Sequence, residues 1–220
     1  MKKIMLVFAI ALMANIGYSQ KSKKATAKAS TAGKTTLAKS GTMTAELFKS
    51  KTDYKLYVLM NNKEKDTLSL KTFPVTTAKE NLPVNFTITP FTSKGTALHN
   101  ISWTEKSFTE IPDKKEDRTT TVTEIWNATT KTQLHSNVQA ATKITEILWL
   151  DKGKNASQTS EKMRNEGFVL TLNPEGDIIL KNKTQENKLV YNVTDNKYDA
   201  VKSAAPAAPA SKPAAAKKRK

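Results

Sequence analysis

The sequence predicts an all-β domain, an antiparallel β-sandwich or barrel of about eight to ten strands, flanked by disordered basic tails. Short runs in which apolar and polar residues alternate recur through residues 43–200, and clusters of Asn, Pro, Gly and Ser separate them. The stretch 118–150 adds two of the three tryptophans and a high density of β-branched residues. A domain of this length buries about 70% of its extended-chain surface, which is enough for it to fold alone.

The first 19 residues are typical of a secretory signal peptide. Two lysines follow the initiating methionine, Ile4–Ala14 is an apolar run of 11 residues, and the small residues Gly17 and Ser19 suit a signal peptidase. We expect cleavage between Ser19 and Gln20, and a protein that is periplasmic, surface-associated or extracellular. The apolar run is shorter than the about 20 residues that cross a bilayer, so no transmembrane segment is expected after signal removal.

Residues 20–42 and 201–220 are expected to be disordered, the first as a Lys/Thr/Ala linker and the second as an Ala/Pro/Lys tail. Neither segment has enough large apolar residues to offset the entropy lost on ordering, and Ala-Pro repeats favour an extended spacer. Of the net charge of +16, the signal holds +2 and each of these segments +6, which leaves +2 for residues 43–200. The basic character therefore belongs to the flanks.

These flanks predict adhesion to anionic partners. A flexible segment with six positive charges can conform to lipopolysaccharide, acidic polysaccharide or extracellular DNA without a shaped site. The alternative is that the flanks only solubilise and space the domain. The residues predicted to bind polyanions are Lys21, Lys23, Lys24, Lys217, Lys218, Arg219 and Lys220.

The first half of the domain predicts two β-hairpins followed by a loop. In each hairpin, apolar and polar residues alternate on both sides of a short run of turn-forming residues, and Pro90 ends one strand because proline cannot donate to the ladder. Residues 106–117 are mostly polar, include Pro112 and are expected to form the loop. The predicted strands are 54–60, 68–71, 84–89 and 98–105.

The stretch 118–150 is compatible with strands or with a helix. As a strand, it places Glu124 between Val122 and Trp126 on one face, which is an awkward position for a carboxylate. As a helix, an apolar stripe and a capping box support an α+β fold with one helix near 137–150. The density of threonine and isoleucine favours strands. Three copies of the phrase Thr-Glu-Ile have unlike flanks, which favours equivalent strands or chance over a repeat array.

The C-terminal strands have a clearer pattern. Residues 168–172 alternate in polarity, and residues 173–177 supply the proline and glycine of a tight turn. Residues 178–181 return from that turn, and residues 189–193 form a last strand. The domain is expected to end between Thr194 and Ala200.

No motif of a known catalytic site occurs, so we predict that the protein is not an enzyme and needs no cofactor. The absence of cysteine excludes disulfides, thiol catalysis and a lipid-modified cysteine. The two histidines, His99 and His135, would need a further ligand to hold zinc, and no metal site is predicted. The short signal and the Lys/Asn/Thr-rich composition resemble those of exported proteins from Gram-negative bacteria.

Two groups of residues keep a role toward carbohydrate open. Four carboxylates, Glu110, Asp113, Glu116 and Asp117, can hydrolyse glycans only if a rigid scaffold makes two of them face each other. Tryptophans either fill a core or stack on sugars from an exposed strand. We therefore expect a secreted or periplasmic, non-catalytic binding or structural protein of the bacterial envelope, and the alternative is a carbohydrate-binding domain or carboxylate-type glycan hydrolase. The candidate stacking residues are Trp103, Trp126 and Trp149.

Overall fold

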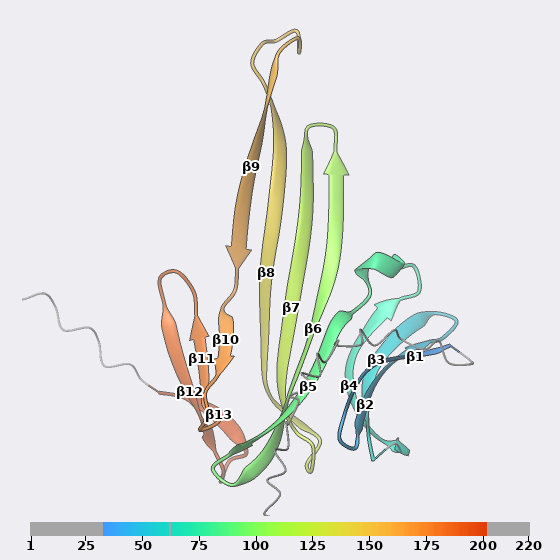
Figure 1. Ribbon diagram of the computed structural model, residues 1–220, viewed down its shortest axis with the longest axis vertical. Coiled ribbons are helices and arrows are strands. Elements are labelled where there is room, and N and C mark those ends of the chain that lie inside the picture. Colours follow the sequence, from blue (N-terminus) through green and yellow to red (C-terminus); the bar gives the residue numbers. More distant parts are fainter. Residues whose placement is uncertain (1–32, 62, 202–220) are drawn as a thin grey trace, which may run out of the picture.

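The computed structural model describes residues 33–61 and 63–201, and this part of the chain is all-β, as the sequence predicts (Figure 1). Thirteen strands, all paired antiparallel, form three sheets within these residues. The helical content of the described residues is a 3-10 turn at Lys79–Asn81. The predicted signal peptide, the first part of the predicted linker and residues 202–220 of the predicted tail lie outside the described residues.

The N-terminal sheet contains four strands that are neighbours in chain order, so each pair is a hairpin. Its inner face carries apolar residues at alternate positions, and Leu56 of one strand lies directly opposite Leu47 of the next. This alternation buries one face of the sheet and leaves the other polar. The strands are β1 (Lys34–Ser40), β2 (Met43–Lys49), β3 (Asp53–Met60) and β4 (Lys63–Pro74).

Strand β1 corrects the predicted limit of the domain. Composition predicts a linker up to residue 42, but β1 begins at Lys34 and pairs with β2 along its length. Leu37 and Ala38 pack against the core of this sheet. An edge strand needs only a few apolar contacts when it completes a sheet that is already formed, so lysine- and threonine-rich composition does not exclude it.

The central sheet contains five strands in chain order, and its three middle strands have 14 to 18 residues, which is unusually long. Strand β8 has 18 residues, which at about 3.3 Å per residue corresponds to roughly 60 Å. The strands are β5 (Val84–Ser93), β6 (Thr96–Ile111), β7 (Lys114–Asn127), β8 (Thr132–Trp149) and β9 (Ser157–Glu166). Residues 137–149, within the span of the alternative helix, therefore form part of β8, as their β-branched composition predicts.

The C-terminal sheet contains four short strands around the predicted turn at residues 173–177. Asn173 closes this turn, because its side chain accepts a hydrogen bond of 2.8 Å from the Asp177 N–H and its carbonyl accepts one of 3.0 Å from the Gly176 N–H. The strands are β10 (Val169–Leu172), β11 (Ile178–Lys181), β12 (Glu186–Asn192) and β13 (Lys197–Ala200).

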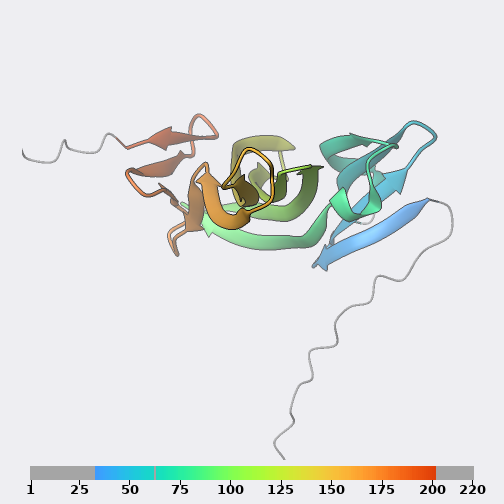
Figure 2. The ribbon, with the colours of Figure 1, turned by 90° about the horizontal axis from the view of Figure 1, so that it is seen from above.

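The two smaller sheets cover opposite faces of the central sheet, and Figure 2 shows them on its two sides. Successive side chains of a strand point to opposite faces. On β7, Trp126 packs in the core shared with the N-terminal sheet, and the adjacent Ile125 packs in the core shared with the C-terminal sheet. On β6, Ile101 and Leu98 are divided in the same way. The central sheet thus joins two separate cores.

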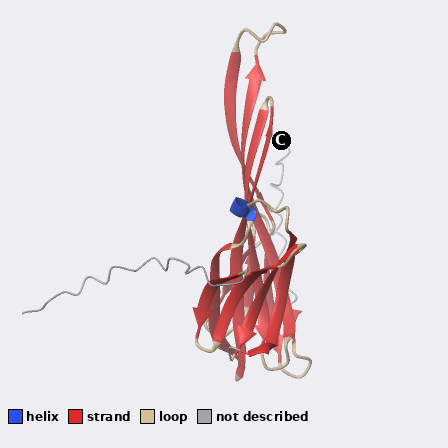
Figure 3. Ribbon diagram, turned by 90° about the vertical axis from the view of Figure 1, so that its right-hand side faces the viewer, coloured by secondary structure: helices blue, strands red, loops and turns tan. Residues whose placement is uncertain are grey.

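The hairpins β6–β7 and β8–β9 continue beyond both smaller sheets as a long arm, which comprises residues 106–117 and 141–164 (Figures 1 and 3). Thr142 and Ile144 of the arm are buried. The residues directly opposite them on β7 and β9 have long charged side chains, which can cover smaller neighbours, and ion pairs of 2.7–4.0 Å link these chains into a lattice. These opposite residues are Arg118, Arg164, Glu116 and Lys162.

The arm also corrects the prediction of a loop at residues 106–117. This segment forms the end of β6 and the start of β7, and Lys115 binds Glu110 across the strands at 2.7 Å. Strands with water on both faces need no apolar alternation, so their polar sequence resembles that of a loop. The same reason accounts for the polar strand β9, which the alternation pattern does not predict.

The connection between β9 and β10 depends on a glycine. Gly167 has a φ of +81°, and a Cβ atom at this position would collide with the carbonyl oxygen of Val138 on β8. Gly95 in the β5–β6 turn has a nearly identical φ of +82° with open space around it. Both glycines therefore need a positive φ, which glycine adopts readily, but only Gly167 lies directly against the backbone of another strand.

We expect Gly167→Ala to destabilise the protein more than Gly95→Ala. Both substitutions incur the cost of about 1–2 kcal/mol for a left-handed residue, and only Gly167→Ala adds a collision, which we expect to cost at least about 1 kcal/mol more. Urea unfolding of the two variants measures the difference. Equal unfolding free energies would contradict the close approach of Gly167 to β8.

Candidate functional site

The predicted polyanion-binding lysines and Arg219 all lie outside the described residues, so the structure does not place them. The other residues singled out by the sequence are placed. They do not form one site, although the groups meet in two places: His99 lies directly opposite Trp126, and Trp149 donates to Asp113.

The two histidines lie on opposite faces of the central sheet. His99 is directly opposite Trp126, and His135 is directly opposite Ile125. Because Trp126 and Ile125 point to opposite faces, the histidines do so as well and cannot share a metal ion. Among the described residues, no group of three or more His, Cys, Asp or Glu side chains is arranged to hold a metal ion.

The three tryptophans have different environments but share one polar contact. Trp103 and Trp126 are buried, and the Trp103 ring stacks on Phe86 with ring centroids 5.8 Å apart. Trp149, near the end of the arm, is 38% exposed and has the Lys154 ammonium 5.0 Å from its ring centroid. Among the three, Trp149 is therefore the one whose ring remains open to a ligand.

Each indole N–H donates to a carboxylate. Trp103 donates to Glu105 at 2.8 Å, and Trp149 donates to Asp113 at 2.9 Å. Trp126 donates to Glu124 at 2.7 Å within the core, which explains why a glutamate stands between apolar residues in β7. Burial raises the pKa of Glu124, and the hydrogen bond from Trp126 acts in the opposite direction.

Three of the four carboxylates between residues 110 and 117 have partners of their own. Glu110 binds Lys115 at 2.7 Å, Asp113 accepts from Trp149, and Glu116 binds Lys114 at 2.7 Å. Glu116 and Asp117 are adjacent on β7 and so point to opposite faces of the arm. This arrangement does not resemble the opposed carboxylates of a glycosidase.

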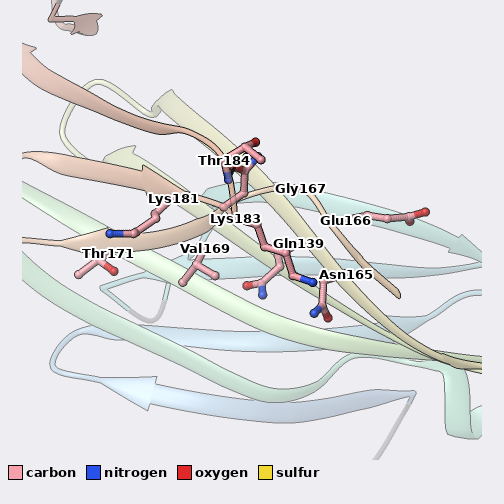
Figure 4. Close-up of a pocket in the computed structure, with 10 residues that line it drawn as sticks. Gln139, Asn165, Glu166, Gly167, Val169, Thr171, Lys181, Lys183 and Thr184 are labelled. Atoms are coloured by element: carbon pink, nitrogen blue, oxygen red, sulfur yellow. Dashed lines mark hydrogen bonds between the residues drawn. The ribbon is translucent and has the colours of Figure 1, made fainter. Parts of the chain in front are cut away.

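A cleft of about 630 Å³, the inter-sheet cleft, lies between the central and C-terminal sheets (Figure 4). One wall comes from β8, β9 and the connection after β9, and the other wall comes from β10, β11 and the turn between β11 and β12. The first wall contributes Gln139, Asn165, Glu166 and Gly167.

The second wall of the inter-sheet cleft is formed by short polar side chains, two lysines and one valine. Its turn is fixed by Asn182, whose side-chain oxygen accepts hydrogen bonds from the N–H groups of Thr184 and Gln185 at 2.9 and 2.8 Å. The lining residues of this wall are Val169, Thr171, Lys181, Asn182, Lys183 and Thr184.

Two contacts fix the chain where it passes from one wall of the inter-sheet cleft to the other. Within the first wall, Gly167 lies against the β8 backbone at Val138. The Asn137 side chain on β8 then donates a hydrogen bond of 3.0 Å to the Phe168 carbonyl, directly before the C-terminal sheet. The docking of that sheet on β8 therefore sets the width of the cleft.

The charges at the inter-sheet cleft are mostly paired. Glu166 binds Arg118 at 2.9 Å and Arg164 at 3.1 Å, and Figure 4 shows its side chain pointing away from the other labelled residues. Lys181 binds Glu186 at 2.8 Å, and this hydrogen bond raises the pKa of Lys181. Lys183 makes no ion pair with any described residue, so it is the free charge of the cleft.

None of the cleft residues belongs to the candidates that the sequence suggests. They come from separate segments of the chain, and apart from Gly167 and Val169 they are ordinary polar or charged residues in strands or turns. The one usable signal is Gly167, an isolated glycine between a polar and an apolar run, because such a glycine often marks a close backbone approach.

Comparison of the chain with protein-family models, curated proteins and solved structures finds no match. Within residues 33–61 and 63–201, no helix has the length and apolar character needed to cross a membrane.

Burial gives the two histidines a pH-dependent effect on stability. His99 Nδ1 and His135 Nε2 are buried without a hydrogen-bond partner among the described residues, and burial lowers the pKa of both side chains below 6.5. The unfolded chain, with histidine pKa values near 6.5, takes up protons first as the pH falls. The free energy of unfolding contributed by these groups therefore decreases on acidification.

We expect the double variant His99→Gln/His135→Gln to lose less stability than the wild type between about pH 7.5 and 5.5. The measurement is urea unfolding of both proteins at the two pH values. The raised pKa of Glu124 has the opposite effect, because its protonation at lower pH increases the free energy of unfolding. Both proteins contain Glu124, so it does not affect the comparison. A pH dependence that is identical in the two proteins would contradict the role given to the histidines.

Proposed function

We propose that this protein is an exported, non-catalytic binding protein of the bacterial envelope, and that its lysine-rich ends adhere to anionic polymers. The observation that carries the proposal is the distribution of charge. Residues 33–201 contain all 20 acidic residues and 24 basic ones, a net charge of +4. Residues 20–32 and 202–220 contain no acid and carry +4 and +6.

The charges of the body are also engaged internally. Ion pairs of 2.7–4.0 Å occupy twelve of the lysines and arginines among the described residues. A cation that is already paired gains less from a polyanion than a free cation does, because its own partner must be displaced. This supports the two ends as the main source of long-range attraction.

The positions where the described chain begins and ends support a bridging role. Gly33 precedes β1 in the N-terminal sheet, and Val201 follows β13 in the C-terminal sheet. These sheets lie on opposite sides of the central sheet (Figure 2). Two cationic segments that leave from opposite sides can engage separate stretches of polymer, and such bivalent binding increases avidity without a new contact.

We expect salt-sensitive binding of the mature chain to lipopolysaccharide and to duplex DNA. For six engaged charges, the slope of log affinity against log salt concentration on DNA should reach about −5. Replacing the six cationic residues of the segment 201–220 by glutamine should lower both the affinity and the slope. A salt titration of both proteins measures this.

The control is the double variant His99→Gln/His135→Gln, which leaves the cationic ends unchanged and should bind as the wild type does. If neutralising the segment 201–220 leaves affinity and slope unchanged, the ends are spacers, and the body must carry any binding.

Export predicts a defined mature end. When the full chain is expressed in a Gram-negative host, mass spectrometry of the exported protein should show a first residue at Gln20, or its cyclised form. An exported protein that retains Met1 would contradict signal cleavage, and a protein found only in the cytoplasm would contradict export.

A further inference from the structure

We propose that the inter-sheet cleft binds a short acidic oligosaccharide, with its carboxylates held by lysine and its hydroxyls held by amide and hydroxyl side chains. The cleft lies in the described body, and its chemistry is independent of the basic ends. The inference therefore goes beyond the proposed adhesion of those ends.

The uncharged polar residues of the cleft match the hydroxyl groups of a sugar. The side chains of Gln139, Asn165 and Thr171 make no hydrogen bond with any described residue. An amide presents both donors and an acceptor, and a hydroxyl does the same, so each can pair with sugar hydroxyls in either sense. Binding there breaks no internal hydrogen bond of the protein.

The lysines favour an anionic sugar over a neutral one. Figure 4 shows Lys183 at the same end of the cleft as Gln139 and Asn165, and Lys181 beside Thr171 at the other end. Lys183 has no ion-pair partner among the described residues. The one acid of the lining, Glu166, is held by two arginines and points away, so no carboxylate opposes an anionic ligand.

The size and rigidity of the cleft suit a ligand of a few sugar rings. Its volume of about 630 Å³ lies within the range of about 300–1,000 Å³ for small-molecule sites. Val169, which is 49% exposed, offers an apolar surface for the C–H groups of a ring. The contact at Gly167 and the Asn182 turn fix the two walls before a ligand arrives, which reduces the ordering cost of binding.

The test uses trigalacturonate as a probe of carboxylates and hydroxyls together. Its methyl ester has the same rings and hydroxyls without charge, and tripolyphosphate has charge without hydroxyls. Affinity is measured by calorimetry on the full mature chain. The side-chain amide NMR signals of Gln139 and Asn165, assigned through the variants Gln139→Ala and Asn165→Ala, report whether binding occurs at the cleft.

We expect trigalacturonate to shift both amide signals and to bind about tenfold more tightly than its ester, since a charge-assisted hydrogen bond is lost with the ester. Lys183→Ala should weaken trigalacturonate binding by a similar factor. The matched control is Lys152→Ala, which removes the same charge from an exposed lysine at the end of the arm and should have no effect.

Three results would each overturn the proposal: equal affinities of the Lys183→Ala and Lys152→Ala variants, unshifted amide signals at saturation, or tripolyphosphate binding as tight as trigalacturonate. Neutralising the cationic residues of the segment 201–220 separates this inference from the adhesion of the ends. That change should weaken binding of long polyanions and leave the trigalacturonate shifts at Gln139 and Asn165 intact.

Discussion

The structure depends on a central β-sheet that is buried on both faces. Ile125 and Trp126 are neighbours in sequence and point into different cores, so one strand contributes to the docking of both smaller sheets. The same strand therefore buries apolar side chains against both the N-terminal and the C-terminal sheet, and this burial stabilises the docking of both. A change in the pairing register of β7 by one residue would exchange the two faces and disrupt both cores together.

Carboxylates accept the hydrogen bonds of the indole N–H groups of the three tryptophans. Each indole N–H lies near an acid that accepts its hydrogen bond, and in two of the three cases the acid is two residues away on the same strand. A residue two positions away shares the face of its neighbour, so the partner is supplied locally. For Glu124, the hydrogen bond from Trp126 partly compensates for the burial of a carboxylate in the core.

The charged residues of the body and those of the two ends of the chain have different roles. Ion pairs bind many cations of the body to its own acids, and the long arm is covered by such a lattice on one face. The excess charge lies in the two ends of the chain, and the inter-sheet cleft retains an unpaired lysine beside unpaired amides. We propose that the protein binds anionic polymers in two distinct ways. The lysine-rich ends attract them by their charge, and the inter-sheet cleft binds a short acidic segment by its shape and polar side chains.

The sequence by itself determined the all-β fold, the turn at residues 173–177 and the concentration of charge at the ends, and it favoured a strand over a helix at residues 137–150. These are local properties, because alternation, β-branching and turn chemistry act over a few residues. Only the tertiary structure decided that β1 and β9 are strands, that residues 106–117 belong to an arm, and that His99 and His135 are kept apart. It also decided the cleft, since Gln139, Asn165 and Lys183 meet only when the C-terminal sheet docks on β8 and β9. Such contacts join residues distant in sequence, and no local pattern encodes them.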